Sequence, residues 1–282
     1  MAKDNKFLVS FSLSGIRIPG ISLAMFDGAW NLHNCYKNSN KMKEGNQGTV
    51  VVDEKIYTIS NNVLFELDLG YNILREKTLD NYTLGHGMKY NDGKLYIVMC
   101  SHAVVLVVDI KTFNIVELIQ HDSYSTHKEA HVNSVDVYDD ATAITVHNLN
   151  RAGYGYIITP NGSRYNVGGE LNQPHDLTFS RFHSDTFFVN NSLDSEVKRI
   201  SVPIEYSWTL KVKGYTRGLL ELNKNTLIIG STERSKSPGC RKRIYVLNSD
   251  TGRILREIEL PDMIGRPKEV LSPEINSITK VK

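Results

Sequence analysis

The sequence is poor in cysteine, and its few cysteines show no pairing by spacing. Cys35, Cys100 and Cys240 are odd in number, and no two of them form a C-x-x-C motif. This pattern argues against a disulfide framework and against a zinc ribbon, which need even-numbered or closely spaced cysteines.

The chain also lacks a strong charge of one sign and any long apolar run. Lys and Arg number 33 against 31 Asp and Glu, a formal net charge of +2, whereas nucleic-acid binders normally carry a large basic excess. No apolar stretch approaches the roughly 18 residues of a membrane span, and residues 1–11 lack the apolar segment of a signal peptide. We therefore expect a cytoplasmic protein that binds neither nucleic acid nor membrane.

What the sequence does contain is a repeat of short strands and tight turns. Residues 86–100 are typical of a strand, an Asn91-Asp92-Gly93 turn and a second, strongly β-prone strand. Two more strands are expected at residues 103–109 and 115–119. Together they predict a four-stranded antiparallel meander.

The same plan recurs along the chain at a nearly constant spacing. The copies begin near Gln47, His86, His131, His175 and Arg217. Successive copies are 39, 45, 44 and 42 residues apart. Four strands in a repeat of about 40–45 residues is the signature of a β-propeller.

A sixth copy is expected to come from both ends of the chain. Residues 269–281 supply one strand, and residues 7–12 and 21–26 supply two more. Closing a ring in this way removes exposed sheet edges. The sequence therefore predicts an all-β fold, a six-bladed β-propeller of four-stranded antiparallel blades, forming one domain over residues 1–282.

Polar residues stand where each copy begins. In a propeller the first strand of each blade lines the central channel, so these side chains converge at one end of the axis. The expected set is Gln47, His86, His131, His175, Arg217 and Glu269. A packed core would place apolar side chains there, so the set indicates a functional site.

The ends of the second strands return to the same rim, because neighbouring strands run antiparallel. These ends are polar as well: Asn61, Asn62, Ser101, His102, His147, Asn148, Asn190, Asn191, Ser231 and Thr232. A basic insertion at residues 233–243 is expected near this rim. It is either a solvated loop or a segment whose Arg234 closes over an anionic ligand.

The expected rim carries residue types suited to metal-assisted chemistry. Imidazoles of His86, His131 and His175 would hold a divalent metal ion with an open fourth position. Arg217 would grip a carboxylate, sulfate or phosphate of the substrate and serve in catalysis. Proton transfer is expected from Glu269 or His147. Further substrate contacts are expected from Gln47, His102, Asn148, Asn190 and Arg234.

Three interpretations of this ring stay open. It is a metal centre, a metal-free site for a polar ligand, or a set of hydrogen bonds that only ties neighbouring blades together. No compact motif such as H-E-x-x-H is present, so the expectation depends on the alignment of the repeats.

At these positions the sequence resembles a bacterial family of predicted six-bladed propeller proteins whose function is unknown. The resemblance lies in Ala130-His131-Val132-Asn133-Ser134, Gln173-Pro174-His175 and Gly214-Tyr215-Thr216-Arg217-Gly218-Leu219, and it continues through Gly230-Ser231-Thr232-Glu233-Arg234-Ser235. Where this chain has Val132-Asn133-Ser134, the family pattern has Leu-Asn-Gly. The resemblance implies a propeller and marks His131, His175 and Arg217, but it implies no reaction.

The sequence favours a small-molecule enzyme acting on an anionic substrate, with a metal-dependent lyase or hydrolase as the leading hypothesis. The alternative is a non-catalytic binding or scaffold propeller whose rim recognises a peptide, a glycan or a small ligand. The sequence carries no signal for an oligomeric state.

Overall fold

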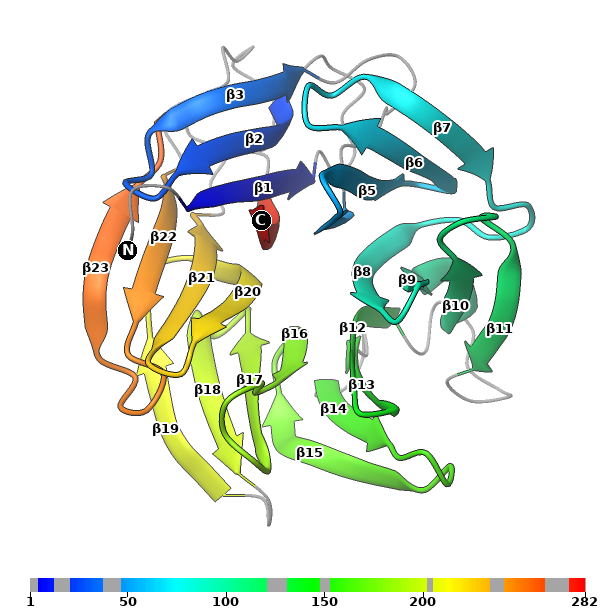
Figure 1. Ribbon diagram of the computed structural model, residues 1–282. Coiled ribbons are helices and arrows are strands. Elements are labelled where there is room, and N and C mark those ends of the chain that lie inside the picture. Colours follow the sequence, from blue (N-terminus) through cyan, green and yellow to red (C-terminus); the bar gives the residue numbers. More distant parts are fainter. Residues whose placement is uncertain are drawn as a thin grey trace.

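The computed structural model describes residues 5–12, 21–37, 47–120, 131–147, 153–201, 205–233, 241–261 and 274–281. These residues form six sheets of four strands, set as blades around a central axis (Figure 1). Neighbouring strands in each sheet are antiparallel, as in the pair β8 (Gly85–Asn91) and β9 (Lys94–Met99). The predicted all-β fold with six four-stranded blades is confirmed.

Each blade is ordered from the axis outward. The innermost strands are β24 (Glu274–Val281), β4 (Gly48–Val52), β8 (Gly85–Asn91), β12 (His131–Tyr138), β16 (Pro174–Phe179) and β20 (Tyr215–Asn223). The second strands are β1 (Lys6–Ser12), β5 (Lys55–Ser60), β9 (Lys94–Met99), β13 (Ala141–His147), β17 (Thr186–Asn191) and β21 (Thr226–Thr232).

The outer half of each blade completes the sheet. The third strands are β2 (Ile21–Asp27), β6 (Val63–Asp68), β10 (Val104–Asp109), β14 (Gly153–Ile158), β18 (Glu196–Ser201) and β22 (Lys242–Leu247). The outermost strands are β3 (Leu32–Lys37), β7 (Ile73–Thr78), β11 (Ile115–Gln120), β15 (Arg164–Leu171), β19 (Glu205–Lys211) and β23 (Ile254–Glu259). A short 3-10 helix, η1 (Cys100–His102), follows β9. The described part of the chain holds no helix with the length and apolarity of a membrane crossing.

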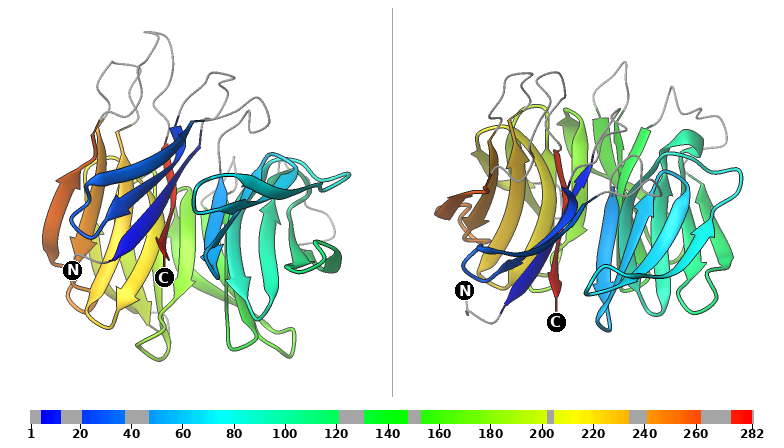
Figure 2. Two further views of the ribbon diagram at one scale, coloured as in Figure 1. Left: turned by 45° about the horizontal axis from the view of Figure 1, so that its top comes forward. Right: turned by 90° about the horizontal axis from the view of Figure 1, so that it is seen from above.

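Strands from the two ends of the chain share one blade. β24 pairs antiparallel with β1 from Lys6 opposite Val281 to Ser12 opposite Glu274. Figure 2 shows the blades from the side, with β24 (red) running along the axis beside β1. Each innermost strand contacts the innermost strands of both neighbouring blades. The predicted closure of the ring is confirmed.

Tight hairpin turns join β8 to β9 and β12 to β13. Asp92 and Gly93 have φ of 42° and 73°, and Asp139 and Asp140 have φ of 49° and 60°. Two successive residues in the left-handed region match the twist of the flanking strands, and Asp and Gly accept this conformation more readily than most residues. The turn predicted at Asn91-Asp92-Gly93 is confirmed.

The apolar core lies between the blades and not on the axis. The described residues form six clusters of buried apolar side chains, one at each contact between neighbouring blades. One cluster joins Val50 of β4 to Ile97 of β9, and another joins Phe7 of β1 to Ile244 of β22. Burial of these side chains stabilises the ring.

Candidate functional site

A β-bulge near the start of the innermost strand interrupts the regular alternation of side chains in five of the six blades. The register shifts on the innermost strands between Gly85 and Met88, Val132 and Ser134, His175 and Thr178, Arg217 and Leu219, and Ile275 and Ser277. In a regular strand, successive side chains point to opposite faces, whereas a bulge re-aims one of them. As a result, His175 and the following Asp176 both line the same axial cavity.

Arg217 links four of the innermost strands at the axis. Its Nη2 donates hydrogen bonds to Nε2 of His86 at 2.9 Å and to Nε2 of His175 at 2.7 Å. Its Nη1 donates to Oδ1 of Asn276, on β24, at 2.7 Å. All four side chains are buried. The structure therefore brings the predicted residues His86, His175 and Arg217 into one cluster, which we call the axial cluster together with Asn276.

The two imidazoles of the axial cluster are neutral. Because a guanidinium can only donate, each Nε2 that faces Arg217 must present a lone pair. Nδ1 of His175 lies 3.0 Å from the carbonyl oxygen of Gln173 and 2.9 Å from Oγ of Ser192, which places its proton on Nδ1. Burial, together with the charge of Arg217, holds the pKa of both His86 and His175 well below 6.5.

The positive charge of Arg217 is only partly balanced by its partners. The carboxylate of Glu274 lies 3.6 Å from Nη1, at ion-pair distance but beyond a good hydrogen bond. The hydrogen bonds to the imidazoles and to Asn276 go to neutral acceptors. A buried cation held mainly by neutral groups creates a positive potential at the axis, which favours an anion there.

A second group of side chains lies beside His86 and suits a metal ion. Ligand atoms of His86, Cys100 and His131 all lie within 4.8 Å of one another. The rings of His86 and His131 are 5.6 Å apart and nearly perpendicular, at 88°. The ring of His147 lies 6.1 Å from that of His131, so His147 adjoins the same group. We call His86, Cys100 and His131 the His-Cys-His group.

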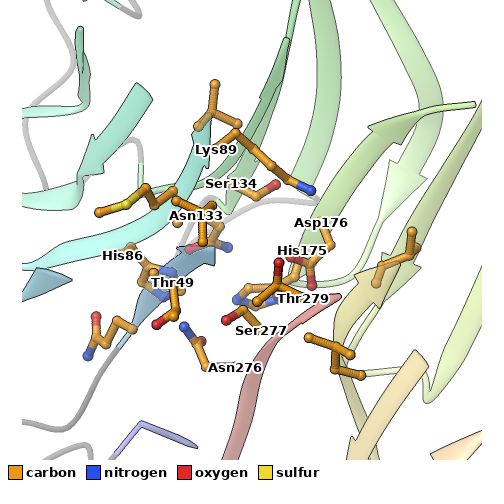
Figure 3. Close-up of a pocket in the computed structure, with 18 of the residues that line it drawn as sticks. Thr49, His86, Lys89, Asn133, Ser134, His175, Asp176, Asn276, Ser277 and Thr279 are labelled. Carbon is orange, nitrogen blue, oxygen red and sulfur yellow. The ribbon is translucent and has the colours of Figure 1, made fainter. Parts of the chain in front are cut away.

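An axial cavity of about 100 Å³ adjoins the axial cluster (Figure 3). Its polar lining includes His86, His175 and Asn276 of the cluster, and Lys89 reaches across it toward Asp176. The volume admits a few water molecules or one small polar group. The cavity thus extends the site along the axis with one further cation and one further acid.

Asp176 is held at the cavity wall by its backbone and by two hydrogen bonds. Its φ of 54° lies in the left-handed region. Its Oδ2 accepts hydrogen bonds from the backbone N–H of Gly218 at 2.8 Å and from Nδ2 of Asn190 at 3.2 Å. Burial raises the pKa of Asp176, while Lys89 acts in the opposite sense. Asp176 is therefore a candidate for carrying a proton in the cavity.

The other predicted site residues lie at different places. Gln47 lines the axial cavity, and Asn190 is fully buried and joins the site through Asp176. His102 is exposed; it lies 2.7 Å from Oγ of Ser101 and edge-on against Tyr82, with ring centroids 5.2 Å apart. Three predicted residues lie outside the described part of the chain: Asn148, Arg234 and Glu269.

Sequence reasoning missed several residues that the structure places at the site: Lys89, Cys100, Asp176, Glu274 and Asn276. Asp176 directly follows a predicted residue, and only the bulge turns it inward. Cys100 ends an apolar strand and reads there as a core residue. One feature of the sequence could have pointed to Asn276: it lies three positions after a Pro in a polar stretch, near the start of the expected closing strand.

No family model matches the chain, and no curated protein matches it. Solved structures do. A protein of unknown function from Bacteroides caccae aligns with a TM-score of 0.73 at 11% identity, over 99% of both chains. The calcium-binding protein regucalcin from Agrobacterium tumefaciens aligns with a TM-score of 0.56 at 15% identity, over 77% of this chain and 75% of its own. Streptogramin B lyase aligns with a TM-score of 0.56 at 14% identity, over 93% of this chain and 75% of its own.

These similarities show the fold alone, because identities of 11% to 15% do not carry a function from one propeller to another. They agree with the resemblance to an uncharacterised propeller family. By their names, one of these similar propellers is a lyase and another is a calcium-binding protein. The function of this chain must therefore be argued from its own side chains.

Proposed function

We propose that the protein is an enzyme that acts on a small anionic molecule at the axial cluster, as a lyase or a hydrolase. One observation carries the proposal. The buried guanidinium of Arg217 is held by the lone pairs of two neutral imidazoles, His86 and His175, and not by a bidentate carboxylate.

The first step of the argument concerns binding. A carboxylate, sulfate or phosphate is a better acceptor for a guanidinium than a neutral imidazole, because both partners are charged. An anion that enters the site would draw the Nη atoms of Arg217 toward itself. The lone pairs of His86 and His175 would then be free beside the bound anion, so binding itself would release a base.

The second step concerns proton transfer. An elimination needs a base that removes a proton from carbon and an acid that protonates the leaving group, and a hydrolysis needs a base for water. A freed imidazole of His86 or His175 supplies the base. Asp176, whose pKa is raised by burial, supplies a proton on the cavity side. His147 and Glu269, predicted for this role from the sequence, stay predictions.

A divalent metal ion on His86, His131 and His175 also stays a prediction. If bound near the axial cluster, such an ion would polarise the substrate or lower the pKa of a water molecule. Arg217 competes for this arrangement, because it already occupies Nε2 of two of the three histidines.

A binding propeller without catalysis is the second candidate, and the size of the axial cavity favours it. A volume of about 100 Å³ is small for a substrate, and the hydrogen bonds of Arg217 already tie four blades together. In that case the anion would be held as a ligand and not converted.

Two experiments test the proposal. Calorimetric titration with sulfate and malonate measures anion binding. Activity assays follow the hydrolysis of chromogenic sulfate, phosphate and carboxylate esters and the appearance of elimination products in the ultraviolet. Wild-type protein should bind at least one anion and turn over at least one substrate. Arg217→Lys should weaken both by about 10-fold or more, because lysine lacks the planar fork. Arg253→Lys, on an exposed arginine, is the matched control.

Binding without turnover would favour the second candidate. No binding of either anion, or equal binding by wild-type protein and Arg217→Lys, would overturn the proposed role of the axial cluster.

A further inference from the structure

We propose that the His-Cys-His group is a binding site for a thiophilic transition-metal ion of the Zn²⁺ type, with the sulfur of Cys100 as a ligand. Metal binding at this group does not depend on the reaction proposed above; only its use in catalysis does.

The geometry of the group is close to that of a metal centre. A tetrahedral ion with metal–nitrogen bonds of about 2.0 Å and a metal–sulfur bond of about 2.3 Å holds its ligand atoms roughly 3.5 Å apart. In the structure these atoms lie within 4.8 Å of one another. Side-chain movements of roughly 1 Å would therefore bring all three onto one ion.

The three ligand residues lie at defined positions of the backbone. His86 lies at the bulge of β8, Cys100 opens the 3-10 helix η1, and His131 is the first residue of β12. η1 is followed by Ala103, whose φ of 51° is left-handed. β12 contacts both β8 and η1. The group thus bridges two neighbouring blades, which is a rigid setting of the kind that metal sites need.

The surroundings of Cys100 agree with this assignment. Its side chain is fully buried, and its Sγ donates to the carbonyl oxygen of Val132 at 2.8 Å. Val132 directly follows His131, so the sulfur already points to the start of β12. A metal ion would replace the thiol proton and take the sulfur as thiolate.

The donor set decides the class of metal. Thiolate and imidazole select Zn²⁺, Cu⁺ or Fe²⁺, whereas Ca²⁺ and Mg²⁺ require oxygen donors. Two imidazoles and one thiolate leave a fourth position for water or substrate, as in catalytic zinc sites. The site is therefore expected to bind Zn²⁺ and to ignore Ca²⁺.

The hydrogen bonds of Arg217 favour a metal ion on the His-Cys-His group over a metal ion on three histidines. An ion on His86, His131 and His175 would require Arg217 to give up both of its imidazole partners. Both ring nitrogens of His175 are already in hydrogen bonds, with Arg217 on one side and with Gln173 and Ser192 on the other. With Cys100 as the third ligand, Arg217 gives up His86 at most and keeps His175 and Asn276.

Arg217 and the metal ion would then lie close to each other, because both are next to His86. Two neighbouring cations are compatible when an anion lies between them, because the attraction of the anion to both offsets their mutual repulsion. Under the proposed function, the substrate anion would bridge the metal ion and Arg217.

The test uses the full chain, purified without a polyhistidine tag, and measures bound metal after incubation with Zn²⁺ and dialysis. About one Zn²⁺ per chain is expected for wild-type protein and for Cys35→Ala, and less than about 0.1 for Cys100→Ala and His131→Ala. His175→Ala should keep the metal.

A second measurement covers the case in which a variant fails to fold. Wild-type protein loaded with Co²⁺ should show the near-ultraviolet charge-transfer band of a thiolate ligand, and a Cys35→Ala, Cys240→Ala double variant should keep that band. A Co²⁺ complex without the band, or wild-type protein that retains no metal, would overturn the inference. Loss of metal in His175→Ala with retention in Cys100→Ala would replace it with the three-histidine site.

Failure of this inference is separable from failure of the proposed function. Sulfate titration of metal-free protein probes Arg217 alone. If wild-type protein retains no metal but binds sulfate in an Arg217-dependent way, the proposed anion site is supported and the proposed metal site is overturned.

Discussion

The guanidinium of Arg217 donates a hydrogen bond to Nε2 of His175 at 2.7 Å, although the two residues are 42 positions apart. That separation is one blade. The two side chains stand at equivalent places on neighbouring innermost strands, so the repeat itself creates the contact. Such a bond between a fixed cation and a buried imidazole requires the imidazole to be neutral, which has measurable consequences.

Acid should destabilise the protein through His175. The native pKa of His175 lies well below 6.5 because burial and Arg217 disfavour the imidazolium. The unfolded chain gains a proton as the pH falls below 6.5 while the native protein does not, so the free energy of unfolding decreases there, by roughly 1 kcal/mol per pH unit for this residue.

Urea unfolding of wild-type protein and His175→Gln at several pH values below 6.5 measures this slope. The variant should lose part of it, and His33→Gln, on an exposed histidine, should not. An unchanged slope in His175→Gln would contradict the neutral imidazole.

Asp176 should have the opposite pH dependence. Its native pKa is raised above the ordinary 3.8 by burial. As the pH rises through the interval between 3.8 and the native pKa, the unfolded chain releases its proton first, so wild-type protein loses stability. Asp176→Asn cannot ionise and keeps an acceptor for the N–H of Gly218, and Asn tolerates the left-handed φ.

The stability of Asp176→Asn relative to wild type should therefore grow across this interval and then level off. Thermal melts at intervals from pH ~4 to pH ~8 would show it. Asp185→Asn is a matched control, because Asp185 is exposed and also has a left-handed φ of 53°. A constant difference across the range would mean that Asp176 is not held protonated.

Asn276 should matter for stability as well as for the site. It accepts a 2.7 Å hydrogen bond from Nη1 of Arg217 in a buried setting. Asn276→Ala is expected to cost about 1.5–3 kcal/mol, the usual range for a buried hydrogen bond to a charged group. Chemical denaturation measures this, with the exposed Asn225→Ala expected within about 0.5 kcal/mol of wild type. Equal stability of the two variants would contradict the bond.

Gly48 should tolerate no side chain, because β4 approaches β8 closely there. A Cβ at Gly48 would lie 2.7 Å from the carbonyl oxygen of His86 and 2.8 Å from the backbone nitrogen of Met88. Gly48→Ala is expected to destabilise the protein by about 1–3 kcal/mol through overpacking. Gly70→Ala, where the nearest atom is a side-chain oxygen of Asp68 at 3.2 Å and not a backbone atom, should destabilise the protein less.

The fold was predictable because the same sequence pattern is repeated several times along the chain. His86, His131, His175 and Arg217 each mark the same point of a blade, so a modest signal in one copy is reinforced by the others. Four of the outermost strands, β3, β7, β15 and β19, were not predicted from the sequence. Polar and apolar residues alternate in Glu205–Lys211 because one side of the strand is exposed, and so short a stretch is difficult to separate from a loop.

The site was predictable only as far as the repeat reaches. His86, His175 and Arg217 meet as expected, but the bulges decide what lies beside them. Nothing in the alternation of residues predicts that Asp176 shares a face with His175, because a regular strand would turn it away. Cys100 was missed for a related reason: at the end of an apolar strand, a cysteine looks like any small core residue.

The strand that seals the ring is also the strand that completes the site. β24 carries Asn276 and Glu274, and it follows every other described strand in the chain. Arg217 is therefore synthesised before two of its partners, Glu274 and Asn276. In a nascent or truncated chain whose blades packed together early, the charge of Arg217 would be buried without these partners. The proposed anion site would in this way depend on the closure of the ring by β24.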